Sequence, residues 1–174
     1  MEISLIPVCA EDISEFKRDM QKAFRKGAEN EFGSLDTEIL PERDIDFSLI
    51  TKGAAAYKAV ADGKMVGGAI VVVDETTRRG HLDFLYVKYG VQSRGVGKAI
   101  WKAIEERYPN TELWETCTPY FEKRNIHFYV NCCGFHIVEY FHQGHPDPHE
   151  KGIEDGDDSG GMFRFEKAIV QKNR

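Results

Sequence analysis

The strongest constraint on the fold is a glycine-containing turn that joins a β-prone run to a helical pattern. His81–Val87 has strand character, and Gly95–Tyr108 carries apolar residues at helical spacing before Pro109. The connecting sequence is Gln92-Ser93-Arg94-Gly95-Val96-Gly97-Lys98. The first turn of a helix has unpaired N–H groups and a partial positive charge, and glycine lets a bulky anion approach the backbone. We therefore expect this turn to bind phosphate groups, with Arg94 and Lys98 adding charge.

The remaining patterns predict one domain over residues 1–174 with a mixed α/β sheet flanked by helices. The predicted strands are Glu2–Val8, Ala55–Ala61, Lys64–Val73, His81–Val87, Thr111–Thr118, Phe135–Phe141 and Met162–Ile169. The predicted helices are Glu11–Lys26, Gly95–Tyr108, Pro119–Cys133 and a short one at Leu35–Leu40. We expect Gly27 to stop the first helix, Asp62-Gly63 to turn a hairpin, and Gly134 to take a left-handed helix-cap conformation. The long stretch Asn30–Leu49 is a candidate lid.

Three kinds of phosphate-binding loop compete for the turn. A Walker loop needs a hydroxyl where Ala99 stands, and a dinucleotide fingerprint needs a third glycine where Ile100 stands. The pattern Gln92-x-x-Gly95-x-Gly97 after a strand ending Leu85-Tyr86-Val87 instead resembles the acetyl-CoA loop of the GNAT N-acetyltransferase superfamily. The segment Asn125–Phe135 looks like a later motif of that family, in which a helix carries a tyrosine and closes on Gly-Phe.

The resemblance implies the GNAT acyltransferase fold, with acetyl-CoA as co-substrate. It assigns coenzyme contacts to the strand end Leu85, Tyr86 and Val87, to Gln92, Ser93, Arg94, Gly95, Val96, Gly97 and Lys98, and to Asn125. It makes Tyr129 the acid for the departing thiolate. Family members usually place that tyrosine four residues before the glycine, where this chain has Val130. Either the helix end is overwound or bulged, or Tyr129 faces differently.

Acetylation of an amine also needs a base, because an alkylamine with a pKa near 10.4 is protonated at neutral pH. Strand alternation predicts that His81, Asp83, Leu85 and Val87 share one face. His81 or Asp83 is then a candidate base, and Asp83 is also a candidate site for a cationic amine. Glu115, on a neighbouring predicted strand, is the other candidate base.

Charge and cysteine placement limit the partners. The net charge is −6, and six acidic residues fall between His142 and Gly161, which argues against nucleic acid and favours a cationic acceptor. We expect His142, His145 and His149 to lie in a solvated loop rather than to bind a metal. No Cys–His pair can be placed from the sequence, so Cys132 and Cys133 are expected to be a buried pair of thiols.

No apolar run is long enough for a bilayer and no signal peptide is visible, so we expect a cytoplasmic protein without a membrane partner. The favoured function is N-acetylation of a primary amine of a small molecule or peptide by direct transfer in a ternary complex. A non-catalytic acyl-CoA-binding sensor of the same fold and a nucleotide-phosphate hydrolase are the alternatives. The family often forms homodimers, although no feature of this sequence demands one.

Overall fold

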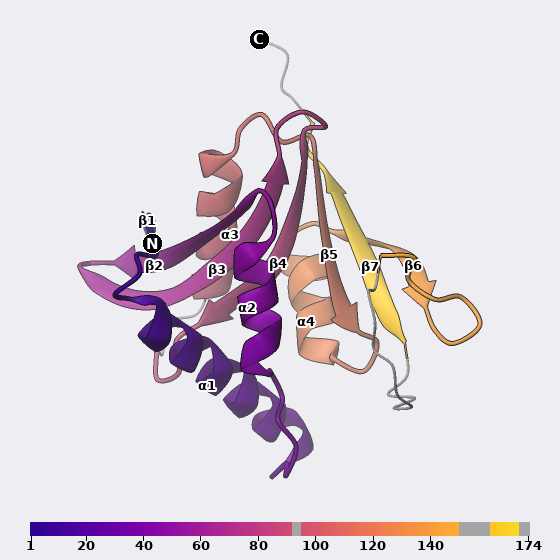
Figure 1. Cartoon of the computed structure of the whole chain (residues 1–174), viewed down its shortest axis with the longest axis horizontal. Helices are drawn as coiled ribbons and strands as arrows, with labels where there is room; N and C mark the ends of the chain where they lie inside the picture. Colours follow the sequence, from indigo (N-terminus) through magenta and orange to yellow (C-terminus); the bar gives the residue numbers. More distant parts are fainter. Residues whose placement is uncertain (92–94, 150–160, 171–174) are drawn as a thin grey trace. The chain divides into compact units, whose positions relative to one another are not determined.

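The structure, a computed structural model, describes residues 1–91, 95–149 and 161–170. The chain divides into two compact units, Met1–Thr111 and Glu112–Arg174. The first unit contains β1 (Ser4–Pro7), α1 (Ile13–Phe32), α2 (Glu42–Ile50), β2 (Ala54–Ala61), β3 (Lys64–Asp74), β4 (Arg79–Val87) and α3 (Val96–Arg107) (Figure 1). The second contains β5 (Leu113–Pro119), α4 (Lys123–His127), the π-helical turn η1 (Phe128–Cys132), β6 (His136–Phe141) and β7 (Met162–Ala168). A single domain over residues 1–174 stays a prediction.

The first unit is built on an antiparallel sheet in the order β1-β2-β3-β4. The predicted hairpin is confirmed: Ala61 pairs with Lys64 across a turn in which Asp62 and Gly63 have φ values of 49° and 72°. Positive φ at both central residues is the condition for a tight hairpin turn that matches strand twist, and Asp-Gly meets it at low cost.

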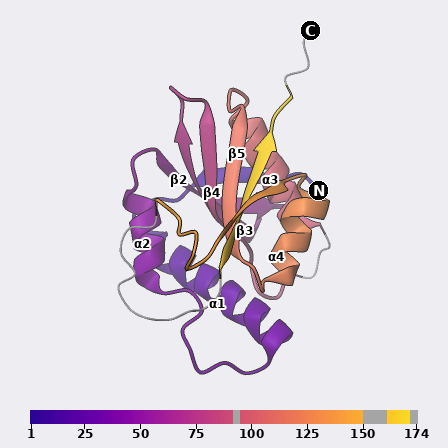
Figure 2. The same ribbon diagram turned by 90° about the vertical axis from the view of Figure 1, so that its right-hand side faces the viewer.

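Helices cover both faces of this sheet (Figure 2). On one face, Phe16 and Met20 of α1 and Ile45 of α2 pack against Ile70 and Tyr86 of the strands. On the other face lies α3, whose buried apolar residues are Val96, Ile100, Trp101 and Ile104. A Cβ on Gly67 would lie 2.9 Å from Ile100 Cδ1 and even nearer the carbonyl oxygen of Tyr86, so only glycine permits this packing.

Two predicted helix boundaries in the first unit are wrong. Helix α1 continues through Gly27 to Phe32 and ends at Gly33, whose φ is 82°. A mid-helix glycine costs about 1 kcal/mol, but Glu29 forms ion pairs with Arg25 and Lys26 across it, and Ala28 is buried.

The short helix expected at Leu35–Leu40 is absent from the structure, and α2 begins after Pro41 instead. Proline disfavours helical conformation in the residue before it but accepts the start of a helix, which explains the direction of the error. Leu40 is buried in the apolar cluster that lies under α1 and α2. The role of Asn30–Leu49 as a lid stays a prediction.

The second unit is an antiparallel sheet in the order β5-β7-β6, together with α4 and η1. Its core includes Trp114, Phe135 and Phe165, each no more than 1% exposed. Gly134 has a φ of 81°, which confirms the predicted left-handed cap. In neither unit do the described residues form a helix with the length and apolar character needed to cross a bilayer.

Candidate functional site

Helix α3 begins at a turn that suits an anion. Gly95, the residue before the helix, has φ 82° and ψ 6°, a left-handed conformation that favours glycine. The first helical hydrogen bond runs from Ala99 N to Gly95 O at 2.9 Å. The amides of Val96, Gly97 and Lys98 therefore precede the first intrahelical bond, and the helix dipole makes this end partially positive.

The surroundings of this turn leave room for a ligand. Among the described residues other than its chain neighbours, no atom lies within 4 Å of the position that a Cβ on Gly95 would take, and both Gly95 and Lys98 are exposed. Gln92, Ser93 and Arg94 lie outside the described residues. The described half of the predicted loop thus fits a diphosphate held by backbone amides, with the Lys98 ammonium group as a nearby cation.

Strand β4 contains a β-bulge at Asp83, which corrects the predicted face. Ile70 of β3 pairs with Phe84 and Val71 pairs with Leu82, so Asp83 is the extra residue. Because a bulge interrupts alternation, Phe84 packs in the cluster under α1 and α2, on the same side as Asp83. His81 and Asp83 therefore share a face with Phe84 and Tyr86. Leu85 and Val87 alternate with these residues and lie on the opposite face.

The bulge joins His81, Asp83 and Ser48 of α2 in a hydrogen-bonded chain. The Ser48 hydroxyl donates to Asp83 Oδ2, and His81 Nδ1 lies 2.6 Å from Asp83 Oδ1. Ser48 is 3% exposed, whereas the His81 side chain is 41% exposed. A carboxylate beside Nδ1 favours the tautomer with its proton on Nδ1, which leaves the basic lone pair on Nε2.

Tyr86, between the two strand residues assigned to the coenzyme, is a core residue. Its side chain is 3% exposed and packs edge-on against Phe16 at 5.7 Å between ring centroids. Burial raises the pKa of its phenol. Any coenzyme contact from Tyr86 therefore has to come from its backbone.

In the second unit, a π-turn explains the displaced tyrosine. Cys133 N donates to Phe128 O at 3.0 Å, a hydrogen bond that spans five residues instead of four. A π-turn accommodates one extra residue in a helix. Of the two sequence alternatives, the helix end is therefore bulged, and Tyr129 points into the core against Phe135 and Phe165.

The environment of Tyr129 keeps its phenol protonated. Burial raises its pKa to about 12, and a hydrogen bond with the Thr116 side chain opposes this rise. The residue is 8% exposed. A tyrosine phenol is protonated at neutral pH with or without this rise, so Tyr129 carries a proton that it can donate.

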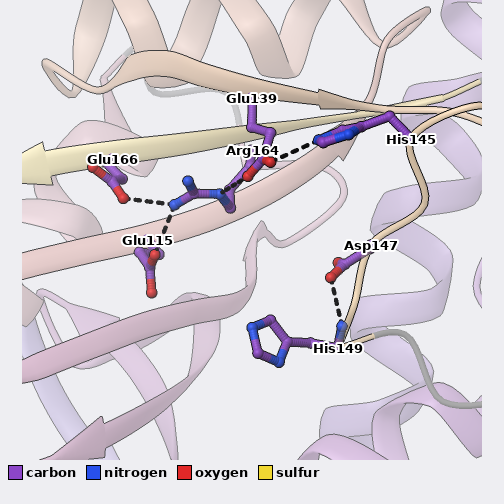
Figure 3. A network of polar contacts seen from close by, with 7 residues as sticks. All are labelled: Glu115, Glu139, His145, Asp147, His149, Arg164 and Glu166. Atoms are coloured by element: carbon purple, nitrogen blue, oxygen red, sulfur yellow. Dashed lines mark hydrogen bonds and ion pairs between the residues drawn. The ribbon is translucent and has the colours of Figure 1, made fainter.

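Glu115, the other predicted base, belongs to an ion-pair network around Arg164 of β7 (Figure 3). Arg164 Nη1 lies 2.9 Å from Glu115 and 2.6 Å from Glu166, and its Nε lies 3.0 Å from Glu139. Arg164 is 27% exposed, and its three partners have similar exposure. The Glu115 carboxylate is therefore engaged as a counterion of Arg164.

Three further predictions fall in the second unit. Asn125 Nδ2 donates to Thr118 Oγ1 at 3.2 Å, so this amide is held against β5. His142 and His145 close a tight turn, and His145 Nε2 lies 2.8 Å from Glu139 (Figure 3). In the part of the chain that the structure describes, no group of three or more His, Cys, Asp or Glu side chains is arranged to hold a metal ion.

The predicted pair of buried thiols is correct only for Cys133. Cys133 is 5% exposed, but Cys132 is only half-buried. Adjacent residues of a helix point about 100° apart, so the two thiols do not face the core together.

Sequence reasoning missed Ser48, Thr116 and Arg164. Ser48 and Thr116 carry no motif, and a hydroxyl in an apolar segment has many possible partners. Arg164 had a detectable signal, since it stands between Phe163 and Phe165 in a predicted strand and must face away from both.

Comparison with known proteins identifies the family. The model of the acetyltransferase (GNAT) family matches residues 17–135. The chain is 44% identical to YrkN of Bacillus subtilis (strain 168) over 170 residues, covering 93% of this chain and 91% of that protein.

Solved structures confirm the predicted α/β fold of GNAT acyltransferases. A Bacillus subtilis acetyltransferase in complex with CoA matches with a TM-score of 0.64 and 21% identity over 97% of this chain and 99% of that one. The spermidine N-acetyltransferase of Vibrio cholerae, in complex with CoA and spermine, matches with a TM-score of 0.65 and 10% identity over 96% and 95%. The family match spans more than half of the sequence, and the chain belongs to the acetyltransferase (GNAT) family.

Proposed function

We propose that this protein transfers the acetyl group of acetyl-CoA to a primary amine of a small molecule or peptide, directly, in a ternary complex. The observation that carries the proposal is the left-handed Gly95 turn before α3 in a chain of this family. Its amides supply the donors that a diphosphate needs, and a structural neighbour is a complex with CoA. The assignment of Gln92–Lys98, Leu85, Val87 and Asn125 to the coenzyme rests on the family resemblance.

His81 is the proposed base. The Asp83 carboxylate holds the proton on Nδ1, so Nε2 is the atom that takes a proton from the ammonium form of the acceptor. Ser48 donates to the same carboxylate and fixes its orientation from α2. Asp83 becomes a positioning residue in this proposal, and Glu115, bound to Arg164, is the weaker candidate.

Two further groups complete the proposed chemistry. A backbone amide near Val87 polarises the thioester carbonyl, as the family resemblance implies. Tyr129, a protonated phenol at neutral pH, donates a proton to the departing thiolate.

We propose a cationic acceptor. The net charge of −6 favours such a molecule, and a neighbour of the same fold is a complex with spermine. Asp155, Asp157 and Asp158, which lie outside the described residues, are proposed to attract it. Replacing all three with Asn should raise the acceptor KM and leave acetyl-CoA affinity unchanged, and an unaltered KM would remove these acids from the proposal.

A thiol-release assay tests the function. Acetyl-CoA is incubated with the protein and a panel of polyamines, aminoglycosides, amino acids and peptides with free N-termini, and CoA release is measured. The proposal expects amine-dependent release with at least one class. Tight CoA binding without release for any amine would instead favour the acyl-CoA sensor, and magnesium-dependent ATP binding would favour the hydrolase.

Variants test the assigned base. His81→Gln should lower kcat/KM by roughly 10²- to 10⁴-fold, the usual contribution of a general base. His136→Gln, which changes an exposed histidine of β6, is the matched control and should retain activity. Asp83→Asn should shift the pH profile of kcat/KM as well as lower it, whereas equal activity of the His81 and His136 variants would refute the base role.

A cytoplasmic location and a homodimer are part of the same proposal. Light scattering on the purified protein measures the oligomeric state directly, and a monomer at all concentrations would remove the dimer.

A further inference from the structure

The helical segment around η1 brings three chemically complementary side chains together. Cys132 Sγ lies 3.8 Å from His127 Nε2, and the Asn131 amide lies 2.9 Å from the other ring nitrogen, Nδ1. His127 and Asn131 are exposed, and Cys132 is half-buried. A thiol, an imidazole and an amide that orients the imidazole are the components of an activated thiol.

The π-turn is what creates this arrangement. In an α-helix, residues five apart are separated by about 140° around the axis, so a thiol at position i+5 cannot reach an imidazole at position i. In a π-turn the winding is looser and residues five apart come nearly into line. Cys132 stands five residues after His127 and Asn131 stands four after it, so the ring is contacted from both sides.

The Asn131 amide determines which proton the ring carries. An amide can present its oxygen or its nitrogen to a ring nitrogen. When the oxygen faces Nδ1, the ring proton sits on Nδ1, and Nε2 is the atom that accepts the thiol proton. When the nitrogen faces Nδ1, the ring proton sits on Nε2 and donates to a thiolate sulfur. Only the first orientation stabilises charge separation between His127 and Cys132, because an imidazolium carries protons on both ring nitrogens and needs an acceptor at Nδ1.

The other cysteines have different surroundings. Cys9 is exposed, and its Sγ donates to Asp12 Oδ2 at 2.9 Å, an oxygen that also lies 2.7 Å from Lys58 Nζ, so a carboxylate and an ammonium group both lie near this thiol. Cys133 is buried at 5% exposure. Cys117, in β5, is partly buried. Exposure alone therefore ranks Cys9 as the most reactive thiol, whereas the imidazole beside the sulfur, which can take up the thiol proton, ranks Cys132 first.

We propose that Cys132 is a covalent modification site that takes up low-molecular-weight thiols from their disulfides. The thiol proton passes to His127 Nε2, and the sulfur attacks one sulfur of the disulfide. The S–S bond of the reagent breaks, a Cys132–S–S bond forms, and the second sulfur leaves with the electron pair as a thiolate. The reagent is the oxidant, and the products are a mixed disulfide and one free thiol.

The test uses an aromatic disulfide, 5,5′-dithiobis(2-nitrobenzoate), which releases one coloured thiolate for each cysteine modified. The full-length protein is treated with one fifth of an equivalent at pH 7, digested, and mapped by mass spectrometry. Cys132 is expected to carry most of the label. Because His127 lies within reach of the thiol proton, Cys132 should react roughly tenfold faster than Cys9.

Two variants test whether the reactivity of Cys132 comes from His127 or only from the solvent exposure of the thiol. His127→Gln should slow the labelling of Cys132 roughly tenfold and leave the rate of Cys9 unchanged, and circular dichroism should show an unaltered fold. Asn131→Ala should slow Cys132 by a smaller factor and alter the pH dependence of its rate, because the ring loses its orienting partner. Faster labelling of Cys9 than of Cys132, or an unchanged Cys132 rate in His127→Gln, would overturn the proposal. The assay contains no acetyl-CoA, so its result is independent of the proposed acetyl transfer.

Discussion

Replacing Gly95 with alanine tests whether the turn before α3 holds a diphosphate. Gly95 has a φ of 82°, and in the described part of the chain no atom beyond its two neighbours lies within 4 Å of the added Cβ. The substitution therefore introduces no clash, and its cost is the strain of a left-handed alanine, about 1–2 kcal/mol. For a chain of this length we expect the melting temperature to fall by roughly 2–8 °C.

The effect on coenzyme binding should exceed the effect on stability. Relief of the strain rotates the peptide groups at the start of α3, which are the proposed phosphate donors. A hydrogen bond to a charged group contributes about 1.5–3 kcal/mol, so the loss of one donor weakens CoA binding roughly 10- to 100-fold. Isothermal titration calorimetry with CoA measures this change directly.

Gly63→Ala is the matched control for this experiment. Gly63 also has a positive φ, 72°, and open space around its missing Cβ, but it lies in the β2–β3 turn. Both variants should lose similar stability, and only the Gly95 variant should lose CoA affinity. Equal CoA affinity in the two variants would refute the role of the α3 turn.

Four other measurements address separate parts of the molecule. Tyr129→Phe should lower kcat and spare CoA affinity, and unchanged kcat would exclude the acid role. Stability should fall as the pH rises from about 10 towards about 12, because the unfolded chain releases the tyrosine proton that folded Tyr129 retains. Hydrogen bonds from Cys9 and Lys58 lower the pKa of Asp12 to about 2. The stability that the Asp12 carboxylate contributes is therefore present above about pH 4 and is lost as the pH falls towards 2. In Asp12→Asn the melting temperature should depend less on pH over this range. Arg164→Gln should lower the free energy of unfolding in urea by roughly 1–3 kcal/mol, because three carboxylates lose their counterion. The control Lys102→Gln breaks an exposed helical ion pair and should change this free energy by no more than about 0.5 kcal/mol.

Local signals were predictable from the sequence. The Asp62-Gly63 turn and the Gly134 cap were predicted correctly because each depends on the φ of one or two residues, and glycine marks such positions. Gly27 was expected to end a helix for the same reason, but α1 continues through it. The ion pairs of Glu29 and the packing of α1 outweigh the low helix propensity of glycine. Propensity decides a structure only where tertiary contacts are weak.

The parts of the candidate site that could not be predicted have a common physical cause. A β-bulge at Asp83 and a π-turn over Phe128–Cys132 each insert one residue into a regular element. Such an insertion is not marked by an unusual composition or by a turn residue. A prediction from residue periodicity therefore continues through it and assigns the residues beyond it to the wrong face.

Both insertions nevertheless position the polar side chains that carry the proposed chemistry. Without the bulge, Asp83 would alternate to the face of Leu85 and would not reach Ser48. Without the π-turn, Cys132 would lie about 140° from His127 around the helix, and Tyr129 would not point between Phe135 and Phe165.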